Sequence, residues 1–382
     1  MTIRRLNAKD YDELLELLNI TFANKNKVET HFDKDLPIMW KRDDEHMGKH
    51  FAVFEDGRMV AALGVYPLPV NILGDSLLFS TVGNVATHPE FEGRGYMKIL
   101  MKEAMAELDR IGADASRLGG LRARYARYGY EMCGTQYRLI FTPHNLKNYY
   151  PDFIPNLIFE PIAETDYEAL EYCCTLYEKQ PFYVLRGRED NYRKTFMSMI
   201  AWQNVPYLIK KDGKSVGFLS MKGDEIAEIF TETPELYKEA ILSLTAMRGS
   251  TVVFYLRPHN VFELREFSRT AENITIQSPS RFKIINYKKV INALLKLKAN
   301  IHPLTDADFT IDIKDYGKLR IISDVDGTRC VDYDGECDIT LSRNNASRLL
   351  FGPLPDYAVA DISEKTGNLL PLPLSWNLQD RV

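Results

Sequence analysis

The stretch VGNVATHPEFEGRGYMKILMKEAM (82–105) decides the fold of this 382-residue chain. An apolar run predicts a strand up to about Thr87, a turn containing Gly93 and Gly95 follows, and a helix is predicted over 95–112. The backbone N–H groups of such a turn and of the first helical turn lack intrahelical partners. Together with the positive end of the helix dipole, they form a site for an anion. Arg94 adds a cation, so the segment fits a pyrophosphate.

Two other interpretations of this segment were weighed. A tight strand-to-helix turn needs glycines even when it binds nothing, so a bare Gly-x-Gly is a weak signal. A dinucleotide-binding Gly-x-Gly-x-x-Gly motif would demand glycine at position 98, which is Lys98. The three antiparallel-looking strands that precede the turn also contradict the β-α-β entry of such a fold.

Outward from this segment, apolar periodicity and turn signals predict a mixed α/β domain of about 140 residues. Hairpins are indicated by Asp56-Gly57 and by Gly74-Asp75. The other predicted elements are strands at 2–6, 114–118 and within 130–141, and helices at 8–22, near 34–46 and near 122–128.

Beyond residue 141 the chain reads as a linker and two further units. The segment 142–156 is rich in Pro and Asn and is predicted to be a linker. Afterwards the element order partly repeats, and from about 281 it changes again. The predicted elements are helices at 164–179, 187–202 and 234–247, strands between them and at 251–258, and helices at 288–299 and 343–351 before a Pro-rich tail. The predicted domains are therefore 1–143, 144–280 and 281–382.

Composition excludes several classes of protein. Forty-eight Lys and Arg face 53 Asp and Glu, a net charge of −5, which argues against a nucleic-acid-binding surface. The apolar runs are too short to span a membrane, and the N-terminus lacks the apolar core of a secretory signal. The odd number of cysteines argues against a disulfide scaffold or a metal site, and we expect reduced thiols in a cytoplasmic protein. These cysteines are Cys133, Cys173, Cys174, Cys330 and Cys337.

A second motif makes the interpretation of the glycine turn more specific. The segment LGGLRARYARYGYEMCG (118–134) follows the glycine turn by about 30 residues, and the pair resembles the GNAT acetyltransferase superfamily. In that superfamily the strand–turn–helix binds the pyrophosphate of acetyl-CoA, and a tyrosine precedes a Gly-aromatic pair, here Tyr125 before Gly129 and Tyr130. Two positions depart from the family pattern, because Glu92 replaces Gln or Arg and Met97 replaces Gly or Ala.

The full layout resembles the enhanced intracellular survival (Eis) acetyltransferase family. This resemblance implies an α/β (mixed α+β) fold with tandem GNAT-like domains and a C-terminal sterol-carrier-protein-like α+β domain. It is sharp only for 82–134 and faint for 160–258, where no glycine-rich turn recurs. We therefore expect one active site per chain, in the N-terminal domain, and a homo-oligomer, because the resembled family assembles into rings.

The resemblance and the chemistry of acyl transfer assign roles to particular residues. Tyr125 is the expected proton donor, because a phenol with a pKa of about 10 roughly matches a coenzyme A thiol. In proteins resembling the Eis family the terminal carboxylate acts as base, which here is that of Val382, with Asp380 as an alternative carboxylate. The residues expected to bind acetyl-CoA are Val85, Ala86, Thr87, Gly93, Arg94, Gly95, Tyr96 and Met97.

Other side chains are less decisive. Phe32 and Trp40 are candidates for the acceptor pocket, although such aromatics are more often core, and His88 reads as a turn residue. The segment SDVDGT (323–328) matches the Asp-x-Asp-Gly-Thr of haloacid-dehalogenase-type phosphatases. Only 54 residues follow it, too few for that fold, and its glycine position excludes an EF-hand, so hairpin turns explain it.

The sequence thus predicts an acetyl-CoA-dependent N-acetyltransferase that transfers an acetyl group directly to an amine of a small molecule. Aminoglycoside-like polyamines are candidate acceptors by resemblance, and the mild negative charge weakly favours a cationic acceptor. A catalytically idle acyl-CoA- or lipid-binding protein is the alternative. No metal, nucleic-acid or membrane partner is expected.

Overall fold

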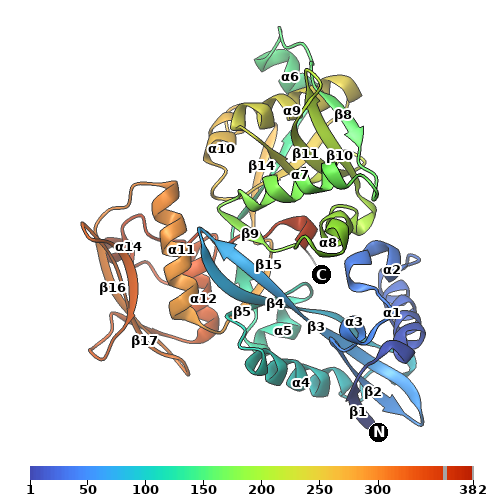
Figure 1. Ribbon diagram of the computed structural model, residues 1–382. Helices are drawn as coiled ribbons and strands as arrows, with labels where there is room; N and C mark the ends of the chain where they lie inside the picture. Colours follow the sequence, from blue (N-terminus) through green and yellow to red (C-terminus); the bar gives the residue numbers. More distant parts are fainter. Residues whose placement is uncertain (356–358, 381–382) are drawn as a thin grey trace.

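The computed structural model describes residues 1–355 and 359–380, which form three β-sheets with helices packed against them (Figure 1). The first sheet has eight strands, the second seven and the third four. In the view of Figure 1 the first unit lies at the bottom, the second at the top and the third at the left. The fold is the mixed α/β arrangement that the sequence predicted.

The first sheet runs in the order β1-β2-β3-β4-β5-β15-β6, with β9 paired to β3. Its hairpins turn at Asp56-Gly57, as predicted, and at Leu73-Gly74, one residue before the predicted pair; all four residues have positive φ. The strands are β1 (Thr2–Arg5), β2 (His50–Glu55), β3 (Arg58–Ile72), β4 (Asp75–Thr87), β5 (Ala115–Leu118), β6 (Glu131–Cys133), β9 (Phe182–Val184) and β15 (Ser280–Ile284).

Helices α1 (Tyr11–Asn26) and α4 (Tyr96–Arg110) pack on this sheet. The helix predicted near 34–46 is wrong as a continuous element. The chain there forms α2 (Phe32–Asp35), η2 (Pro37–Met39) and α3 (Asp44–Met47). Pro37 has no N–H to extend α2, and the Asp43 side chain caps a new helix by accepting from the His46 amide.

The second sheet runs β14-β7-β13-β12-β11-β10-β8. It contains β7, which precedes the predicted domain boundary at 143, whereas β15, next to the boundary at 280, lies in the first sheet between β5 and β6. The two units therefore exchange strands. The second-sheet strands are β7 (Gln136–Phe141), β8 (Ile158–Pro161), β10 (Val205–Lys211), β11 (Lys214–Lys222), β12 (Glu225–Thr231), β13 (Val252–Leu256) and β14 (Asn273–Gln277).

The segment predicted to be a linker contains a helix, α6 (Pro143–Tyr149). Thr142 and Asn145 cap it reciprocally, and Pro143 occupies its first position, where no intrahelical N–H is needed. The other helices of the second unit are α7 (Tyr167–Glu178), α8 (Glu189–Met199), η5 (Ala201–Gln203), α9 (Pro234–Arg248) and α10 (Val261–Phe267).

The third sheet has the order β18-β17-β16-β19, with helices α11 (Tyr287–Ile301) and α12 (Arg343–Phe351) packed against its elements. The Asp-x-Asp-Gly-Thr segment is the hairpin between β17 and β18, as predicted, and Arg329 pairs with Asp324 across it. The strands are β16 (Ala307–Ile313), β17 (Gly317–Asp324), β18 (Gly327–Asp332) and β19 (Ile339–Leu341), and the short helices α14 (Ser363–Thr366) and η6 (Leu378–Asp380) follow.

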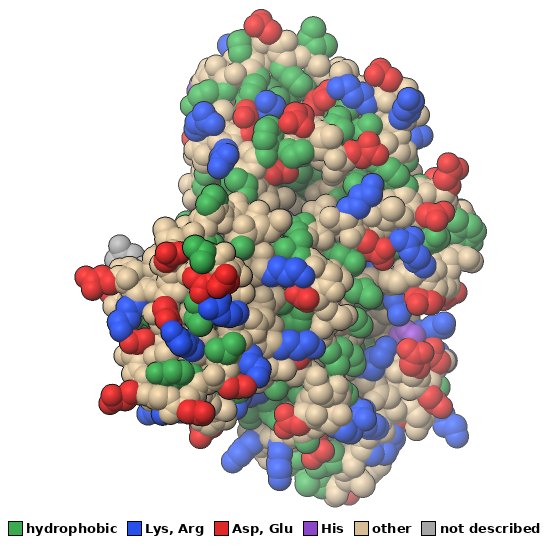
Figure 2. Space-filling view, turned by 60° about the vertical axis from the view of Figure 1, so that its left-hand side comes forward, with side chains coloured by type: hydrophobic (Ala, Val, Ile, Leu, Met, Phe, Trp, Pro, Cys, Tyr) green, Lys and Arg blue, Asp and Glu red, His purple; other side chains and the backbone are tan. Residues whose placement is uncertain are grey.

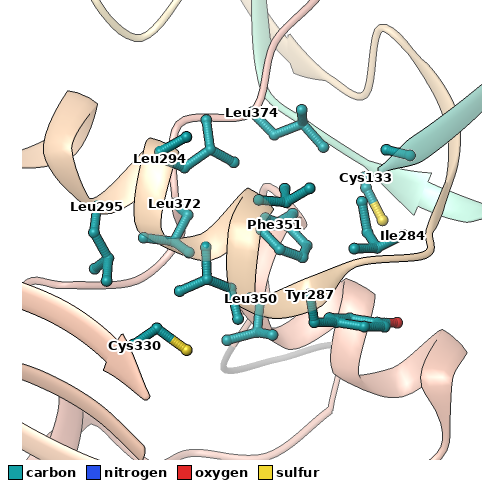
Figure 3. Packing of buried hydrophobic residues seen from close by; sticks show 14 of the residues in the cluster. Cys133, Ile284, Tyr287, Leu294, Leu295, Cys330, Leu350, Phe351, Leu372 and Leu374 are labelled. Atoms are coloured by element: carbon teal, nitrogen blue, oxygen red, sulfur yellow. The ribbon is translucent and has the colours of Figure 1, made fainter. Parts of the chain in front are cut away.

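One hydrophobic core joins the third unit to the first. Figure 3 shows Leu294 of α11 and Phe351 of α12 close to Ile284 of β15 and Cys133 of β6. The C-terminal tail closes the same core, because Trp376 stacks on Phe79 with ring centroids 5.8 Å apart. The third unit therefore supports the sheet that carries the glycine turn.

The distribution of charged side chains on the surface agrees with the nearly equal numbers of acidic and basic residues. On the face shown in Figure 2, acidic and basic side chains are interspersed, and neither sign gathers into one patch. Within the described ranges, no helix has the length and apolar character that crossing a bilayer requires.

Candidate active site

The first sheet opens at the place that the sequence singled out. Strands β4 and β5 are parallel and pair only from Phe79 to Thr81, after which β5 ends at Leu118. Beyond Thr81, β4 continues to Thr87 and pairs only with β3 on its other side. The free edge of β4 therefore faces a gap between two diverging strands, as expected for the binding of an extended ligand.

A β-bulge in β4 sits at the mouth of this gap. The register with β3 shifts between Ala62 and Gly64, and Asn84 adopts a left-handed backbone with φ of 54°. A bulge of this kind bends the strand and redirects the side chain at the extra residue. Here it brings Asn84 to the wall of the gap.

Asn84 begins a buried hydrogen-bonded chain. Its Nδ2 donates to the Tyr66 hydroxyl at 2.8 Å, and that hydroxyl lies 2.7 Å from Nε2 of His50. Nδ1 of His50 donates to the Met47 carbonyl at 3.2 Å, so Nε2 is the acceptor for Tyr66. Burial lowers the pKa of His50 to about 4, which keeps the imidazole neutral in this role. The chain fixes the Asn84 side chain at the bulge.

The glycine turn follows β4 with the conformation predicted for it. Gly93 and Gly95 have φ of 79° and 85°, and Gly95 precedes the first residue of α4. The amides of Lys98 and Ile99 donate to the Gly95 carbonyl. The amides that precede Lys98 in the turn and the first helical turn therefore have no partner within the helix. These amides and the helix dipole favour an anion at this place.

Side chains around the turn hold its shape. Arg94 lies with its guanidinium carbon 4.6 Å from the centre of the Phe91 ring, and it forms an ion pair with Glu55 at 3.1 Å. Tyr96 donates to the same Glu55, and this bond raises the pKa of Tyr96. The predicted cation of the turn is thus already paired with Glu55, which leaves the backbone amides as the candidate donors to an anion.

Tyr125 lies on the opposite side of the gap, at the end of α5 (Arg122–Tyr125). Its side chain is buried, and burial raises its pKa, with the neighbouring Arg124 opposing the shift. Gly120 has φ of 132°, and a Cβ there would lie 2.7 Å from a ring carbon of Tyr125. Gly120 therefore lets the tyrosine ring lie against the backbone.

A cavity of about 330 Å³ occupies the gap. Three of the site residues predicted from the sequence line this cavity, namely Val85, Phe32 and Tyr125. Trp40 packs in the core against Tyr11 and His50 and does not line this cavity. Ala86 and Thr87 pair with β3, next to the cavity-lining Val85. His88 caps η3 (Pro89–Phe91), which is the predicted turn role.

The second unit supplies one wall of the cavity. Trp202 of η5 lines it, and its neighbour Gln203 donates to Asp35 of α2 at 2.7 Å. Both residues have positive φ, 60° and 63°, which is a strained backbone for such side chains. The first and second units thus meet at the cavity, and strained residues hold the contact.

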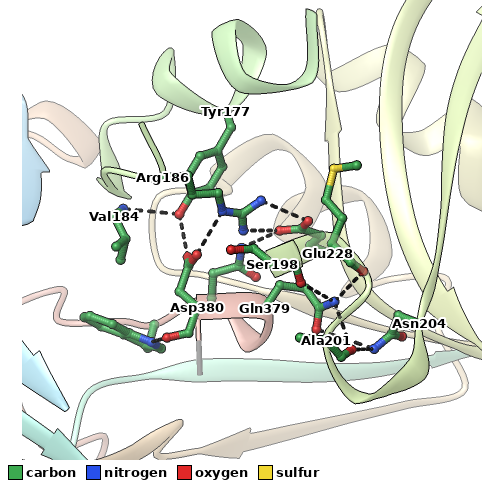
Figure 4. Close-up of polar contacts among 12 residues, drawn as sticks. Tyr177, Val184, Arg186, Ser198, Ala201, Asn204, Glu228, Gln379 and Asp380 are labelled. Atoms are coloured by element: carbon green, nitrogen blue, oxygen red, sulfur yellow. Dashed lines mark hydrogen bonds and ion pairs between the residues drawn. The ribbon is translucent and has the colours of Figure 1, made fainter. Parts of the chain in front are cut away.

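The C-terminal tail runs under the same contact. Gln379 donates to the carbonyls of Ser198 and Met199, and Asp380 is buried against Tyr177 and Arg186 (Figure 4). Asp380, the alternative carboxylate, is therefore engaged in the second unit and does not line the cavity. Val382, the predicted base, lies outside the described residues.

Sequence reasoning missed Asn84, Tyr66 and Trp202. Asn84 lies inside the quoted segment, and asparagine tolerates left-handed backbone better than most residues, so a bulge could have been suspected there. Tyr66 and Trp202 carry no such local signal, because their positions depend on how strands and units pack.

Comparisons with known proteins agree with this geometry. Residues 2–133 match the family model described as an acetyltransferase (GNAT) domain. No curated protein sequence matches the chain. Among solved structures, a probable N-acyltransferase from Enterococcus faecalis is 14% identical with a TM-score of 0.68, covering 98% of this chain and 97% of that chain.

Two further structures share the fold over nearly the whole length. A GCN5-related N-acetyltransferase from Anabaena variabilis has a TM-score of 0.66 at 14% identity, with 98% of each chain covered. Eis1 from Mycobacterium abscessus has a TM-score of 0.61 at 14% identity, covering 91% of this chain and 89% of that chain.

The match to the GNAT family model supports an acyltransferase, a class of enzyme that uses acyl-CoA. Residues 2–133 form a GNAT acetyltransferase domain by this match, and the fold of most of the chain is similar to that of Eis1.

Proposed function

We propose that this chain is an acetyl-CoA-dependent N-acetyltransferase that transfers the acetyl group directly to an amine in the 330 Å³ cavity. The observation that carries the proposal is the position of Tyr125, which lines that cavity across the gap from the free edge of β4. Acetyl-CoA would lie with its pyrophosphate at the amides of the glycine turn, and its thioester would reach the cavity. The diverging strands allow both ends to be bound at once.

In the proposed reaction the amine nitrogen attacks the thioester carbonyl, a C–N bond forms and the C–S bond breaks. The departing thiolate takes the proton of the Tyr125 hydroxyl. Burial raises the pKa of Tyr125, so the phenol remains protonated at neutral pH and can serve as the acid. The nitrogen loses one proton, which we assign by resemblance to the Val382 carboxylate.

The charges of the cavity bear on the acceptor. Among the described residues that line the cavity, Asp35 is the one carboxylate, and Lys25 and Arg124 are two cations. A strongly polycationic acceptor of the aminoglycoside type would meet two like charges there. We therefore propose a small primary amine with at least one polar or acidic substituent, which Asp35 and the two cations can bind together.

The proposal is tested by following thiol release from acetyl-CoA with a panel of amines. We expect Tyr125→Phe to lower kcat by a factor of about 10² to 10⁴, the usual contribution of a general acid, with an unchanged Kd for acetyl-CoA. Equal rates for the two proteins would contradict the role of Tyr125. No turnover on any amine by protein that binds acetyl-CoA would favour the idle binding protein.

A matched glycine pair separates catalysis from folding. Gly120→Ala places a Cβ 2.7 Å from the Tyr125 ring, whereas a Cβ at Gly119 meets nothing within 4 Å. We expect Gly120→Ala to lower kcat and Gly119→Ala to leave it nearly unchanged. Deletion of Val382 alone tests the base, and an unaltered pH profile of kcat/KM in that variant would exclude it.

Three assignments remain proposals, the first from the order of predicted elements and the other two from the resemblance. They are the domain boundaries 1–143, 144–280 and 281–382, the sterol-carrier-like character of the third unit, and the homo-oligomer. The four-stranded sheet covered by α11 and α12 supports the second of these. Sedimentation of the full chain tests the third.

A further inference from the structure

A second cavity, of about 530 Å³, lies between the second and third units. Its walls come from α10 and β14 of the second unit, the last turn of α11, and the tail segment 371–373 (Figure 1). None of its lining residues belongs to the active-site cavity. The volume is within the usual range for a pocket that binds a small molecule.

Most of the cavity wall is apolar. Ile274 and Ile276 are two positions apart on β14, so they point to the same face of this edge strand. Their side chains are 37% and 54% exposed, which is unusual for isoleucine. Leu264, Pro371 and Pro373 continue the same wall. An apolar chain could cover both isoleucines.

Two cations and a histidine lie at the same cavity. Arg265, Lys298 and His302 line it, and among the described residues no Asp or Glu does. Lys298 donates to the Pro371 carbonyl at 3.1 Å, and neither Lys298 nor Arg265 forms an ion pair within the described ranges. Within the part of the chain that the structure describes, the cavity therefore has positive side chains beside an apolar wall and no carboxylate.

A buried polar group also faces this space. The Thr135 side chain lines the cavity and is almost fully buried, with 6% of the residue exposed. Its Oγ1 has no hydrogen-bond partner among the described residues.

We propose that this cavity binds a medium-chain fatty acid, with the carboxylate at Arg265 and Lys298 and the alkyl chain along Ile274 and Ile276. The pairing follows from charge and shape, because a carboxylate supplies the missing anion and an alkyl chain covers the exposed isoleucines. A free phosphate would leave the apolar wall exposed, and an alkylamine would place its charge beside like charges. The site does not depend on the proposed acetyl transfer.

Titration calorimetry of decanoate into the full-length protein tests this site. We expect one binding site per chain, retained when the protein is saturated with acetyl-CoA, since the two cavities share no lining residue. Decanol and decylamine, which have the same chain length, should bind at least about tenfold more weakly. Equal binding of decanol, competition by acetyl-CoA, or no binding of decanoate below its micelle concentration would overturn the proposal.

Matched variants separate specific binding from general affinity for lipids. Arg265→Gln removes an exposed cation of the cavity, and Arg269→Gln removes an exposed arginine just beyond the end of the same helix that does not line it. We expect about a tenfold loss in the first and no change in the second. Ile276→Asp, at an exposed position, should abolish binding. An unchanged affinity in both Arg265→Gln and Ile276→Asp would exclude this cavity.

Discussion

The first and second units open their sheets in the same way and use the openings differently. In the first, β4 and β5 part after Thr81, and the gap holds the active-site cavity. In the second, the parallel strands β12 and β13 pair only at Glu225 and Val253, with a register shift in β12 nearby. Around Glu228 of β12 that gap is filled by protein, because Glu228 contacts Arg186, and Asn377 of the tail donates to Glu228 at 2.7 Å. Beyond this point a cavity of about 340 Å³ lies between the end of β12, the turn before α9 and the segment that follows β13.

The turns that follow β4 and β12 also differ in their ability to bind an anion. Where the first unit has Gly93 and Gly95, the second has Glu232, Thr233 and Pro234. Pro234 has no N–H, and the Thr233 side chain accepts from the Leu236 amide, so the donors at the start of α9 are absent or already used. Glu232 adds a negative charge. The same backbone arrangement therefore favours an anion at the first turn and disfavours one at the second.

The largest effect that we predict concerns the filled gap. Arg186 is 2% exposed and pairs with Glu228 at 2.6 Å and with Asp380 at 3.0 Å. Burial alone would lower the pKa of Arg186, but the Asp380 and Glu228 carboxylates more than offset it and raise that pKa. Arg186→Ala should lower the free energy of unfolding by about 3–5 kcal/mol, because it leaves two buried carboxylates unpaired. Urea denaturation measures this.

A nearby arginine provides the control for this prediction. Arg188 pairs with Glu178 on the surface, where an ion pair contributes about 0–1 kcal/mol, so Arg188→Ala should change the urea midpoint little. If Arg186→Ala were as stable as Arg188→Ala, the second gap would not be held closed by this cluster, and the contrast with the first gap would lose its physical basis.

The next effect tests the turns directly. Gly93→Asp would place in the first turn the kind of charge that the second turn carries, and Gly93→Asn has the same shape without the charge. Both side chains tolerate the positive φ of Gly93 better than most residues. We expect Gly93→Asp to raise the KM for acetyl-CoA by about 10- to 100-fold, through repulsion of the pyrophosphate. Gly93→Asn should raise it by less than about threefold.

The dependence of KM on ionic strength distinguishes an effect of the introduced charge from an effect of backbone strain at residue 93. The effect of Gly93→Asp should shrink as salt is added, because the turn is exposed and its charges are screened. In the second unit, Glu232→Gln should leave this KM unchanged. A KM that rises equally in Gly93→Asp and Gly93→Asn would show that conformation, and not charge, separates the two turns.

The contrast also shows what the sequence could predict. The glycine turn, the tyrosine motif and the hairpins were predictable because each is encoded by neighbouring residues with a local conformational need. The helix α6 was missed because Pro and Asn, read as linker residues, here serve as its first position and its cap. The exchange of β7 and β15 between sheets was not predictable, because strand pairing at long range depends on which edges are free after the units fold.

The sequence predicted cavity residues of the first unit but not the wall that the second unit supplies. A substitution in that second wall gives the smallest effect that we predict. Trp202 comes from the second unit, so the unit without a glycine turn still shapes the site of the first. Trp202→Ala removes the side chain, which is 43% exposed and lies outside the hydrophobic cores. We expect the KM for the amine to rise by about tenfold, with the KM for acetyl-CoA within twofold, because Trp202 lines the cavity proposed to hold the amine. The variant Trp202→Gly distinguishes the loss of the cavity wall from the relief of backbone strain at this position. Glycine accepts the positive φ of this position, so that variant should show the same amine KM and a higher free energy of unfolding than Trp202→Ala. A change in the KM for acetyl-CoA alone would show that the second unit acts on the first through the cofactor and not through the acceptor cavity.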